Sequence, residues 1–531
     1  MSITFLGAAH EVTGSCTFLK ICDKNILIDC GMEQGKDIYE NCELPISPSD
    51  VDVLLLTHAH IDHSGKIPLL CKNGFRGKIY TTEATLRLCR LMLLDSAHIQ
   101  EFEAEWRNRK ALRAGDAPYE PLYTSNDVEK AMTQFCGLSY NTTYKLCRGA
   151  TMRFIDAGHL LGSASIEITY SDKEGEEQTI LFSGDIGNIN RPLICDPQKP
   201  TKGRIVVIES TYGTRLHDRP KDYVSQLSEI ISDTLDRGGN VVIPSFAVGR
   251  TQELLYLIHE IKSKNLIKNH PDFPVWIDSP LSSEVTKVYT MGMTDYYDSE
   301  TLEFLDKGIN PLSFEGLHFA ETAEESRAIN FDSTPKVIIS SSGMCEAGRI
   351  RHHLKHNLWR KDSTVLFVGY QAEGTLGRIL LDGADSVKIF GETIHCAARI
   401  ENMDGISGHA DQRILLDWLR NIDPKPQMVF VNHGNDEVCD QFADIIKTQL
   451  GILATAPYNG GVYDLATLSC IEPGNREKLQ KSVRTNDAFF ERLISAVKQL
   501  LKIAENFRHR DNRSKKQFAN DVETLCEKWK D

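Results

Sequence analysis

A short segment at residues 57–65 carries the side chains best suited to chemistry. It reads Thr-His-Ala-His-Ile-Asp-His-Ser-Gly, and its imidazoles and carboxylate are His58, His60, Asp62 and His63. These are the groups that zinc and related divalent cations prefer as ligands. The alternative is a chance cluster of histidines in a surface loop. The H-x-H-x-D-H spacing at the end of an apolar run favours a metal site.

Four more candidate ligands each follow a short apolar run. They are Asp29 in Ile-Leu-Ile-Asp-Cys-Gly, His159 in Asp-Ala-Gly-His-Leu-Leu-Gly, Asp185 in Phe-Ser-Gly-Asp-Ile-Gly and His433 in Phe-Val-Asn-His-Gly-Asn. Glycine flanks several of them and lets the backbone turn sharply or approach closely. Each of these segments alone is compatible with a simple turn. Their joint pattern indicates a shared site.

The elements that must position these residues follow from hydrophobic patterning. Runs rich in Ile, Val and Thr predict strands at 3–8, 17–21, 25–29, 51–56, 78–82, 152–155, 165–170 and 179–182. From residue 204, strands at 204–208, 240–244, 275–277, 336–340 and 364–368 alternate with helices such as 222–237 and 250–262. This alternation is typical of a parallel α/β sheet. Further strands are expected at 386–390 and 428–431, a helix at 82–94, and a polar surface insertion at 100–126.

Size and composition limit the class of protein. A chain of 531 residues with 41% hydrophobic and 25% charged residues is expected to form two or three globular domains. No apolar run approaches the roughly 18 residues of a membrane span, and the strand at the N-terminus argues against a signal peptide. The 14 cysteines are scattered without C-x-x-C spacing, which does not support a zinc ribbon. We therefore expect a cytoplasmic protein with reduced thiols and no membrane partner.

Charge is distributed unevenly along the chain. The net charge of −14 argues against a general nucleic-acid coat, although a local basic cleft remains compatible with it. Residues 475–531 carry 14 Lys or Arg and 9 Asp or Glu, a net of +5, so the preceding part carries −19. Apolar residues at helical spacing in this tail are Phe490, Leu493, Ile494, Val497 and Leu501. They predict a helix that packs against the body or a second subunit, which leaves a homodimer open. Attraction of RNA by the positive charge of the tail is the alternative.

The sequence resembles the β-CASP branch of metallo-β-lactamase-fold hydrolases, a branch of RNA-processing nucleases. The resemblance rests on eight stretches: Leu-Gly-Ala-Ala-His-Glu-Val-Thr-Gly-Ser-Cys (6–16), the histidine motif (57–65), Ser-Gly-Asp-Ile-Gly (183–187), Glu-Ser-Thr-Tyr-Gly (209–213), Ile-Pro-Ser-Phe-Ala-Val-Gly-Arg (243–250), Ser-Ser-Gly-Met (341–344), Ser-Gly-His-Ala-Asp (407–411) and Val-Asn-His-Gly (431–434). Similar proteins include bacterial and archaeal ribonucleases that resemble the nuclease subunit of the pre-mRNA cleavage and polyadenylation machinery. The tail after residue 465 lies outside the resemblance.

This resemblance implies a fold and a domain order. The fold class is α/β: a metallo-β-lactamase αββα sandwich with an inserted β-CASP α/β cap domain and a helical C-terminal tail. We expect the first part of the sandwich at 1–208, the cap at 209–385, completion of the sandwich at 386–465 and a helical extension at 466–531.

The resemblance also implies two zinc ions per chain. The ligands expected for one ion are His58, His60 and His159. Those expected for the other are Asp62, His63 and His433, and Asp185 is expected to bridge the two ions. Asp29 would contact the ligands without binding a metal itself, and it would orient both the ligands and the attacking water.

Two metals about 3.5–4 Å apart can share a hydroxide and clamp a phosphodiester. The departing alkoxide needs a proton, and the resemblance makes His409 the candidate acid, with Glu209 holding its tautomer and supporting its charge. These two residues and Asp62 form the expected catalytic group. The alternative for His409 is a core histidine tied to a backbone carbonyl.

Substrate phosphates are expected to meet a small set of polar groups, namely Arg250, Ser342, Gly343 and Ser407. Ser342 and Gly343 end a predicted strand, where backbone N–H groups can bind an anion. Arg250 opens a helix and can grip phosphate, or it can form an ion pair with a nearby acid. The basic run 349–356 is either a solvated helix face or a rim that faces RNA.

The expected function is a zinc-dependent ribonuclease. It would hydrolyse single-stranded RNA and leave 5′-phosphate and 3′-hydroxyl ends, with the balance of endo- and exonuclease action open. One alternative is a hydrolase with the same metal site acting on DNA or a small phosphodiester. Another is a non-catalytic RNA-processing scaffold. DNA-repair members of the branch usually lack a histidine at the position of His433, and the intact ligand set disfavours a scaffold.

Overall fold

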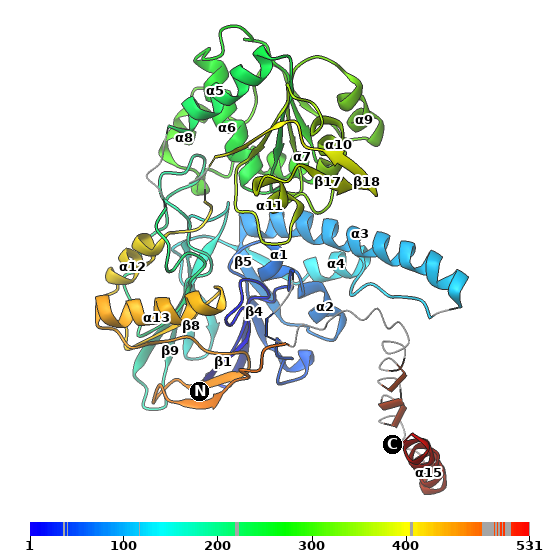
Figure 1. Cartoon of the computed structure of the whole chain (residues 1–531). Coiled ribbons are helices and arrows are strands. Elements are labelled where there is room, and N and C mark those ends of the chain that lie inside the picture. Colours follow the sequence, from blue (N-terminus) through cyan, green and yellow to red (C-terminus); the bar gives the residue numbers. More distant parts are fainter. Residues whose placement is uncertain are drawn as a thin grey trace. The chain divides into compact units, whose positions relative to one another are not determined.

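The computed structural model describes residues 1–35, 38–39, 41–115, 117–217, 222–403 and 407–479, and part of the remaining chain: 493, 496–497, 500–501, 503–504 and 511–529 (Figure 1). The chain divides into two compact units, Met1–Glu477 and Lys478–Asp531. The first unit contains the sheets described below and every predicted site residue.

The first sheet is mixed and has eight strands in the order β23-β22-β1-β2-β3-β4-β5-β6. Its strands are β1 (Ser2–Gly7), β2 (Cys16–Ile21), β3 (Lys24–Ile28), β4 (Val53–Leu55), β5 (Lys78–Thr82), β6 (Phe135–Leu138), β22 (Gly461–Asp464) and β23 (Cys470–Pro473). β1, β2 and β3 pair antiparallel, whereas β3 to β6 run parallel. Cys22 and Asp23, both with positive φ, form the tight turn between β2 and β3.

The second sheet has seven strands in the order β21-β20-β11-β10-β9-β8-β7. They are β7 (Tyr144–Cys147), β8 (Ala150–Asp156), β9 (Ala164–Ser171), β10 (Glu177–Phe182), β11 (Ile205–Glu209), β20 (Met428–Asn432) and β21 (Ala454–Thr455). β11 and β20 are parallel neighbours, with Ile205 opposite Met428. The roughly 220 residues that separate them in sequence therefore form an insertion between adjacent strands of one sheet.

The two sheets face each other across an apolar core. Phe5 of the first sheet meets Phe154 and Phe430 of the second in one buried cluster. Helices cover the two outer faces: α1 (Ile61–Ser64), α2 (Ile67–Lys72), α3 (Glu83–Ala114) and α4 (Ser125–Met132) on the first sheet, and α12 (Gln412–Arg420) and α13 (Asp436–Leu450) on the second. This gives four layers in the order α, β, β, α (Figure 1).

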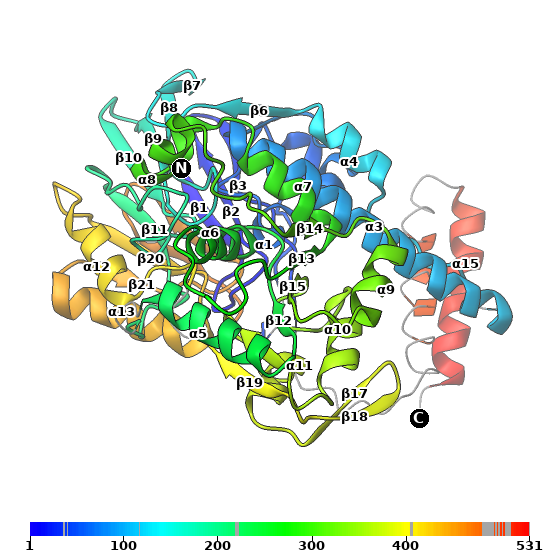
Figure 2. The same cartoon turned by 90° about the horizontal axis from the view of Figure 1, so that it is seen from above.

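The inserted domain is built on a third sheet of six parallel strands, in the order β14-β13-β15-β12-β16-β19. The strands are β12 (Val241–Pro244), β13 (Val275–Asp278), β14 (Leu317–Phe319), β15 (Val337–Ser340), β16 (Thr364–Phe367) and β19 (Arg399–Asn402). Its helices are α5 (Tyr223–Asp236), α6 (Arg250–Ser263), α7 (Pro280–Tyr289), α8 (Ser299–Asp306), α9 (Ala323–Phe331), α10 (Ile350–Asn357) and α11 (Leu376–Leu381). A hairpin of β17 (Ser386–Ile389) and β18 (Glu392–His395) lies beside them (Figure 2).

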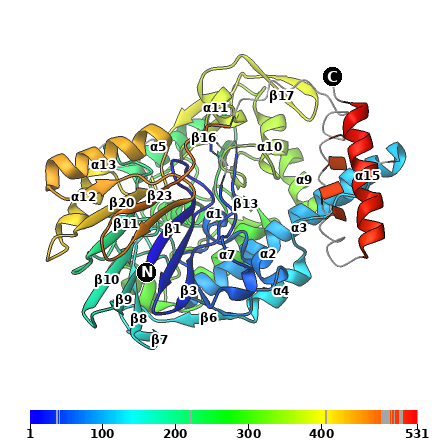
Figure 3. The same cartoon turned by 90° about the horizontal axis from the view of Figure 1, so that it is seen from below.

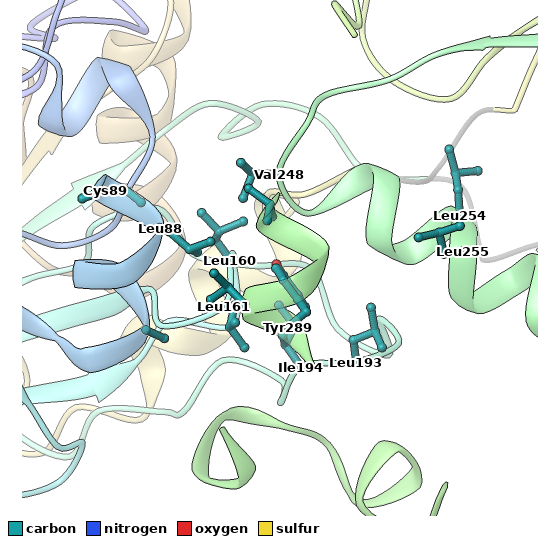
Figure 4. Close-up of a cluster of buried hydrophobic side chains, with 14 of the residues drawn as sticks. Leu88, Cys89, Leu160, Leu161, Leu193, Ile194, Val248, Leu254, Leu255 and Tyr289 are labelled. Carbon is teal, nitrogen blue, oxygen red and sulfur yellow. The ribbon is translucent and has the colours of Figure 1, made fainter. Parts of the chain in front are cut away.

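An apolar cluster joins the inserted domain to the sandwich. Leu88 of α3 and Leu160, beside His159, belong to the same buried cluster as Val248 and Tyr289 of the inserted domain (Figure 4). Burial of such side chains stabilises contact by roughly 1.5–3 kcal/mol each. The inserted domain is thus seated directly above the loop that carries a predicted ligand.

Three local predictions differ from the structure. Residues 100–114, expected as a polar insertion, continue α3, because no Gly or Pro interrupts them and Glu–Arg pairs such as Glu103–Arg107 lie one turn apart. Gly115, with φ of 74°, ends the helix in the left-handed conformation. Residues 470–473, which the sequence places in the helical extension at 466–531, instead form β23, which pairs with β22 through backbone hydrogen bonds.

The third difference concerns where the inserted domain ends. The strand at 386–390 was expected to resume the sandwich, but Val387 and Ile389 belong to the core of the inserted domain, and β19 joins its sheet. The inserted domain therefore continues past the predicted limit at 385. The other predicted boundaries stay predictions.

The second unit contains α15 (Asn512–Lys528) among its described residues (Figure 3). Of the predicted apolar stripe, Leu493, Val497 and Leu501 are helical, whereas Phe490 and Ile494 lie outside the described residues. No helix in the described part of the chain is long and apolar enough to cross a membrane.

Candidate metal centre

The predicted ligands all sit just beyond the carboxyl ends of strands. Asp29 follows β3, the 58–63 segment follows β4, His159 follows β8, Asp185 follows β10 and His433 follows β20. Since these ends lie at the same edge of the two facing sheets, residues more than 370 positions apart in sequence converge there. Ligand sites form at this edge of α/β sheets because the loops there can aim several side chains at one point.

The first group consists of His58, His60, His159 and Asp185, whose ligand atoms lie within 4.8 Å of one another. Nδ1 of His60 is 3.0 Å from Nε2 of His58 and 3.2 Å from Nε2 of His159. Asp185 Oδ2 lies 3.6 Å from Nε2 of His58 and 3.7 Å from Nε2 of His159. All four ligand atoms therefore point at a common centre.

The second group consists of Asp62, His63 and His433. Nε2 of His63 is 3.0 Å from Nε2 of His433, which is 3.6 Å from Asp62 Oδ2. The other carboxylate oxygen of Asp185, Oδ1, is 3.3 Å from His63 Nε2 and 3.7 Å from His433 Nε2. Asp185 thus presents one oxygen to each group, as a bridging ligand would.

In four of these imidazoles, the ring nitrogen that faces away from the ligand group contacts a neighbouring polar atom. Nδ1 of His63 lies 2.7 Å from Asp29 Oδ2, and Nδ1 of His58 lies 3.1 Å from Thr57 Oγ1. Nδ1 of His159 lies 3.1 Å from the carbonyl oxygen of Gly408, and Nδ1 of His433 lies 3.3 Å from Thr211 Oγ1. Such contacts fix the tautomer and the ring orientation of metal-binding histidines. Asp29 also accepts a hydrogen bond from the Thr57 N–H; its role in orienting metal ligands stays a prediction.

The donor set fits a pair of zinc ions. Tetrahedral coordination with Zn–N bonds of 2.0–2.1 Å separates two ligand nitrogens by about 3.3 Å, close to the 3.0–3.2 Å found between these imidazoles. Asp185 Oδ1 is buried and makes no hydrogen bond of good geometry within the described residues. A buried carboxylate oxygen without such a partner is costly unless a cation compensates it.

In the first group, the electrostatics favour the protonation states that metal ligands need. Burial, reinforced by neighbouring histidines, lowers the pKa of His58 and His159 well below the usual value, so both rings are neutral. Burial alone would raise the pKa of Asp185, but His433, His63 and His58 hold it well below its ordinary value. The first group therefore combines neutral imidazoles with an ionised carboxylate before any metal binds. Burial alone would lower the pKa of His63 and His433, but the charge of Asp185 raises both above the usual value, so metal binding to the second group competes with protonation of these rings.

His409 and Glu209 stand beside the two groups as a separate pair. His409 Nδ1 is 3.2 Å from Glu209 Oε2 and 3.9 Å from Asp185 Oδ2, and its side chain is 22% exposed. Burial lowers the pKa of His409, but the charge and hydrogen bond of Glu209, followed by Asp185, raise it to about 9. The ring is therefore protonated at neutral pH. Asp185, Glu209 and His409 also form a third cluster with metal-ligand spacing. Measuring the metal content of a His409 variant therefore decides whether this residue is an acid or a metal ligand.

Arg191 is a residue of the site that the sequence did not predict. Its Nε donates to Glu253 Oε1 at 2.7 Å, and its Nη1 donates to the carbonyl oxygens of His159 at 2.8 Å and Gly408 at 3.1 Å. It thereby links the inserted domain to a candidate ligand and to the residue before His409. Nothing in the local sequence distinguishes Arg191 from an exposed loop arginine, because its partners lie far away in the chain.

Arg250 is buried, and its guanidinium pairs with Glu253. This is the ion pair that the sequence left open as the alternative to phosphate binding. Glu253 thus holds both Arg250 and Arg191, and burial lowers the pKa of Arg250. A role for Arg250 on phosphate stays a prediction.

The other predicted phosphate-binding residues lie in two loops. Ser342 and Gly343 follow β15, where the Gly343 carbonyl accepts a hydrogen bond from Gln371 at 2.9 Å. Ser407 Oγ accepts from the His409 N–H at 3.2 Å, and Ser407 lines a hollow of about 210 Å³ with Tyr212 and other residues. Their contact with phosphate stays a prediction.

The basic run 349–356 corresponds largely to α10, and part of it faces inward. Arg349 and the buried His353 both bind Asp278, at 2.7 and 2.6 Å. Lys355 pairs with Glu392 of the β17–β18 hairpin. These side chains have partners within the inserted domain, which favours a structural role over a rim that faces RNA.

Metal content tests the ligand assignment. We expect close to two zinc ions per chain by elemental analysis, and we expect Asp185→Ala to lose more than one because its oxygens face both groups. His433→Ala should lose metal from the second group. His409→Ala serves as the control and should keep both ions; loss of metal in this variant would make His409 a ligand.

Known proteins match the chain over most of its length. Residues 11–120 match the family described as Metallo-beta-lactamase superfamily, residues 251–380 match the Beta-Casp domain, and residues 393–457 match the Zn-dependent metallo-hydrolase RNA specificity domain. The third segment includes His409 and His433.

Among curated relatives, Ribonuclease TTHA0252 of Thermus thermophilus is 37% identical, over 82% of this chain and 94% of its own length. An RNase J-like protein of Methanocaldococcus jannaschii is 30% identical, over 87% of this chain and 99% of its own length. Transcription termination factor FttA of Methanosarcina mazei is 31% identical, over 86% of this chain and 70% of its own length.

These matches confirm the expected metallo-β-lactamase fold with a β-CASP insertion and the expected class of metal-dependent hydrolase. The chain belongs to the β-CASP family of metallo-β-lactamase-fold RNA-processing nucleases.

Proposed function

We propose that this protein is a zinc-dependent ribonuclease that hydrolyses single-stranded RNA and leaves 5′-phosphate and 3′-hydroxyl ends. The observation that supports this best is the position of Asp185. Its two carboxylate oxygens face two separate ligand groups, and the His409–Glu209 pair stands at the same carboxylate. This arrangement suits hydrolysis of a phosphodiester with a metal pair on one side and a proton donor on the other.

His58, His60 and His159 would hold one zinc ion, Asp62, His63 and His433 the other, and Asp185 both. Bound there, the two ions supply hydroxide at neutral pH and offset the negative charge of the phosphodiester. The protein contributes rigidity, because Asp29 and Thr57 fix the ligand rings from behind.

His409 would donate the proton that the leaving 3′-oxygen needs. Its Nδ1 is directed at Glu209, so its Nε2 is the atom that can face substrate. Because its pKa lies near 9, the ring is charged at neutral pH and ready to donate. After transfer, the nearby carboxylates of Glu209 and Asp185 favour return of the proton to the ring.

RNA is the substrate favoured by the relatives, two of which are named as ribonucleases or RNase J-like. The match of residues 393–457 to an RNA specificity domain supports the same substrate class. DNA or a small phosphodiester remains the alternative for the same metal site. A non-catalytic scaffold is disfavoured because the whole predicted ligand set converges. The cytoplasmic location stays a prediction.

Substrate and products can be tested together. With 5′-labelled single-stranded RNA, double-stranded RNA and DNA of matched sequence, we expect chelator-sensitive cleavage with a preference for single-stranded RNA. Direct attack by hydroxide does not use the 2′-oxygen, so mass spectrometry should find 5′-phosphate and 3′-hydroxyl ends. Cyclic 2′,3′-phosphates would contradict this attack, and equal cleavage of DNA would support the alternative substrate.

The acid role of His409 predicts a loss of turnover without a loss of metal. His409→Ala should lower kcat by roughly 10²- to 10⁴-fold, the usual contribution of general acid–base catalysis. His270→Ala is the control, because His270 pairs with Asp236 on the outside of the inserted domain. Unchanged kcat in His409→Ala would remove this residue from the reaction.

Arg191 is expected to position the site without touching substrate. Arg191→Ala should reduce kcat by roughly 10- to 100-fold, the scale for losing a group that supports a metal ligand, and should weaken zinc binding by the first group. Arg191→Lys should restore part of both. Arg153→Ala, which breaks the Arg153–Glu167 pair elsewhere in the sandwich, is the matched control and should alter neither.

A further inference from the structure

The outer half of α3 is unlike the rest of the surface. Up to Ala97 the helix contributes buried residues such as Leu88 and Leu93 to the core. Beyond that point Ile99, Phe102 and Trp106 are 57%, 64% and 52% exposed. Figures 1 and 2 show this half of α3 extending past α4, away from the sandwich.

These three side chains form one face. Their spacing, i, i+3 and i+7, places them on the same side of the helix, in an apolar stripe of the kind that packs against another element. Lys110 and Arg107 lie over the rings of Trp106 and Tyr119 and cover them in part. Such coverage is the usual arrangement for isolated surface aromatics, yet Trp106 remains half exposed.

The returning chain after α3 widens this face. Asn108 makes two hydrogen bonds to the backbone of Tyr119, at 3.0 and 2.6 Å, and so fixes the return segment against the helix. A hollow of about 510 Å³ lies between them, lined in part by Phe102, Tyr119 and Pro121. The face is therefore a preformed surface rather than a bare helix.

The charges on this half of α3 are divided at Trp106. Glu103 and Glu105 precede it, and the basic residues Arg107, Arg109, Lys110 and Arg113 follow it. Glu101 is not part of this surface, because its carboxylate accepts hydrogen bonds from the backbone N–H and the hydroxyl of Ser125 at the start of α4. Two copies of the helix that pair antiparallel about Trp106 bring each acidic half opposite the basic half of the other copy. A parallel pairing would bring like charges together. The internal pairs Glu103–Arg107 and Glu105–Arg109 are exposed, so they are weak and can be shared with a partner.

We propose that the outer half of α3 is a self-association surface that binds a second copy of this chain, with the two α3 helices antiparallel across a two-fold axis near Trp106. The same surface on both subunits is the commonest arrangement of homodimers. The apolar stripe supplies the buried centre, and the divided charges select the antiparallel direction.

The test is the mass of the full-length zinc-loaded protein in solution, measured by light scattering over a wide range of protein concentration. The intact protein should form dimers. Trp106→Glu should raise the dimer's dissociation constant by roughly 30-fold or more, the scale of an aromatic residue at an interface centre. Phe331→Glu is the control, because Phe331 is also an exposed aromatic residue, 78% exposed at the end of α9. Zinc content and ribonuclease activity report folding of each variant.

Charge reversal tests the direction of pairing. Replacing Glu103 and Glu105 with Lys, or the four basic residues with Glu, should each abolish self-association. A mixture of the two variants should form heterodimers. A monomeric intact protein, a dimer that survives Trp106→Glu, a mixture that stays monomeric, or a Trp106→Glu variant that loses only RNA affinity would each overturn the proposal.

Discussion

The buried carboxylate of Asp185 is the constraint on which the site depends. An ionised group in the interior is stable only when charges or hydrogen bonds compensate it. Here His58 and His159 lie near one oxygen, and His63 and His433 lie near the other. These residues come from loops after β4, β8 and β20, so the two sheets must be held with their carboxyl edges together. The apolar core between the sheets, with Phe5 against Phe430, supplies that rigidity.

The backbone around this carboxylate adopts conformations that follow from crowding. Asp29 and His433 have φ values of 60° and 51°, which side-chain-bearing residues seldom adopt. A Cβ at Gly187 would lie 1.7 Å from the Gly158 carbonyl oxygen, so no larger residue fits at this position. That close approach lets the loop after Asp185 pack against the loop that carries His159. Strained or glycine-dependent backbone at such positions is sustained by the packing of the surrounding structure.

The sequence predicted what is local and missed what is distant. The H-x-H-x-D-H spacing and the strand ends at Asp29, Asp185 and His433 are short-range signals, and the structure brings these residues together, with Asp29 in contact with His63. The alternation of strands and helices likewise indicated the parallel sheet of the inserted domain. Arg191 carries no such signal, because its partners His159, Glu253 and Gly408 lie 32, 62 and 217 residues away. The length of α3 was underestimated because charged residues at 100–114 also suit a loop.

The inserted domain and the metal groups are physically coupled through Arg191. Its partner Glu253 lies on α6 of the inserted domain, whereas its other partners are the carbonyls of His159 and Gly408. The Gly408 carbonyl also meets Nδ1 of His159, so one oxygen orients a ligand and adjoins the backbone of His409. Removal of one partner of a buried ion pair is strongly destabilising, because the other charge is then buried without compensation. Withdrawal of the inserted domain would therefore disturb the proposed metal ligand His159 and the proposed proton donor His409 together, which makes seating of this domain a condition for an assembled site.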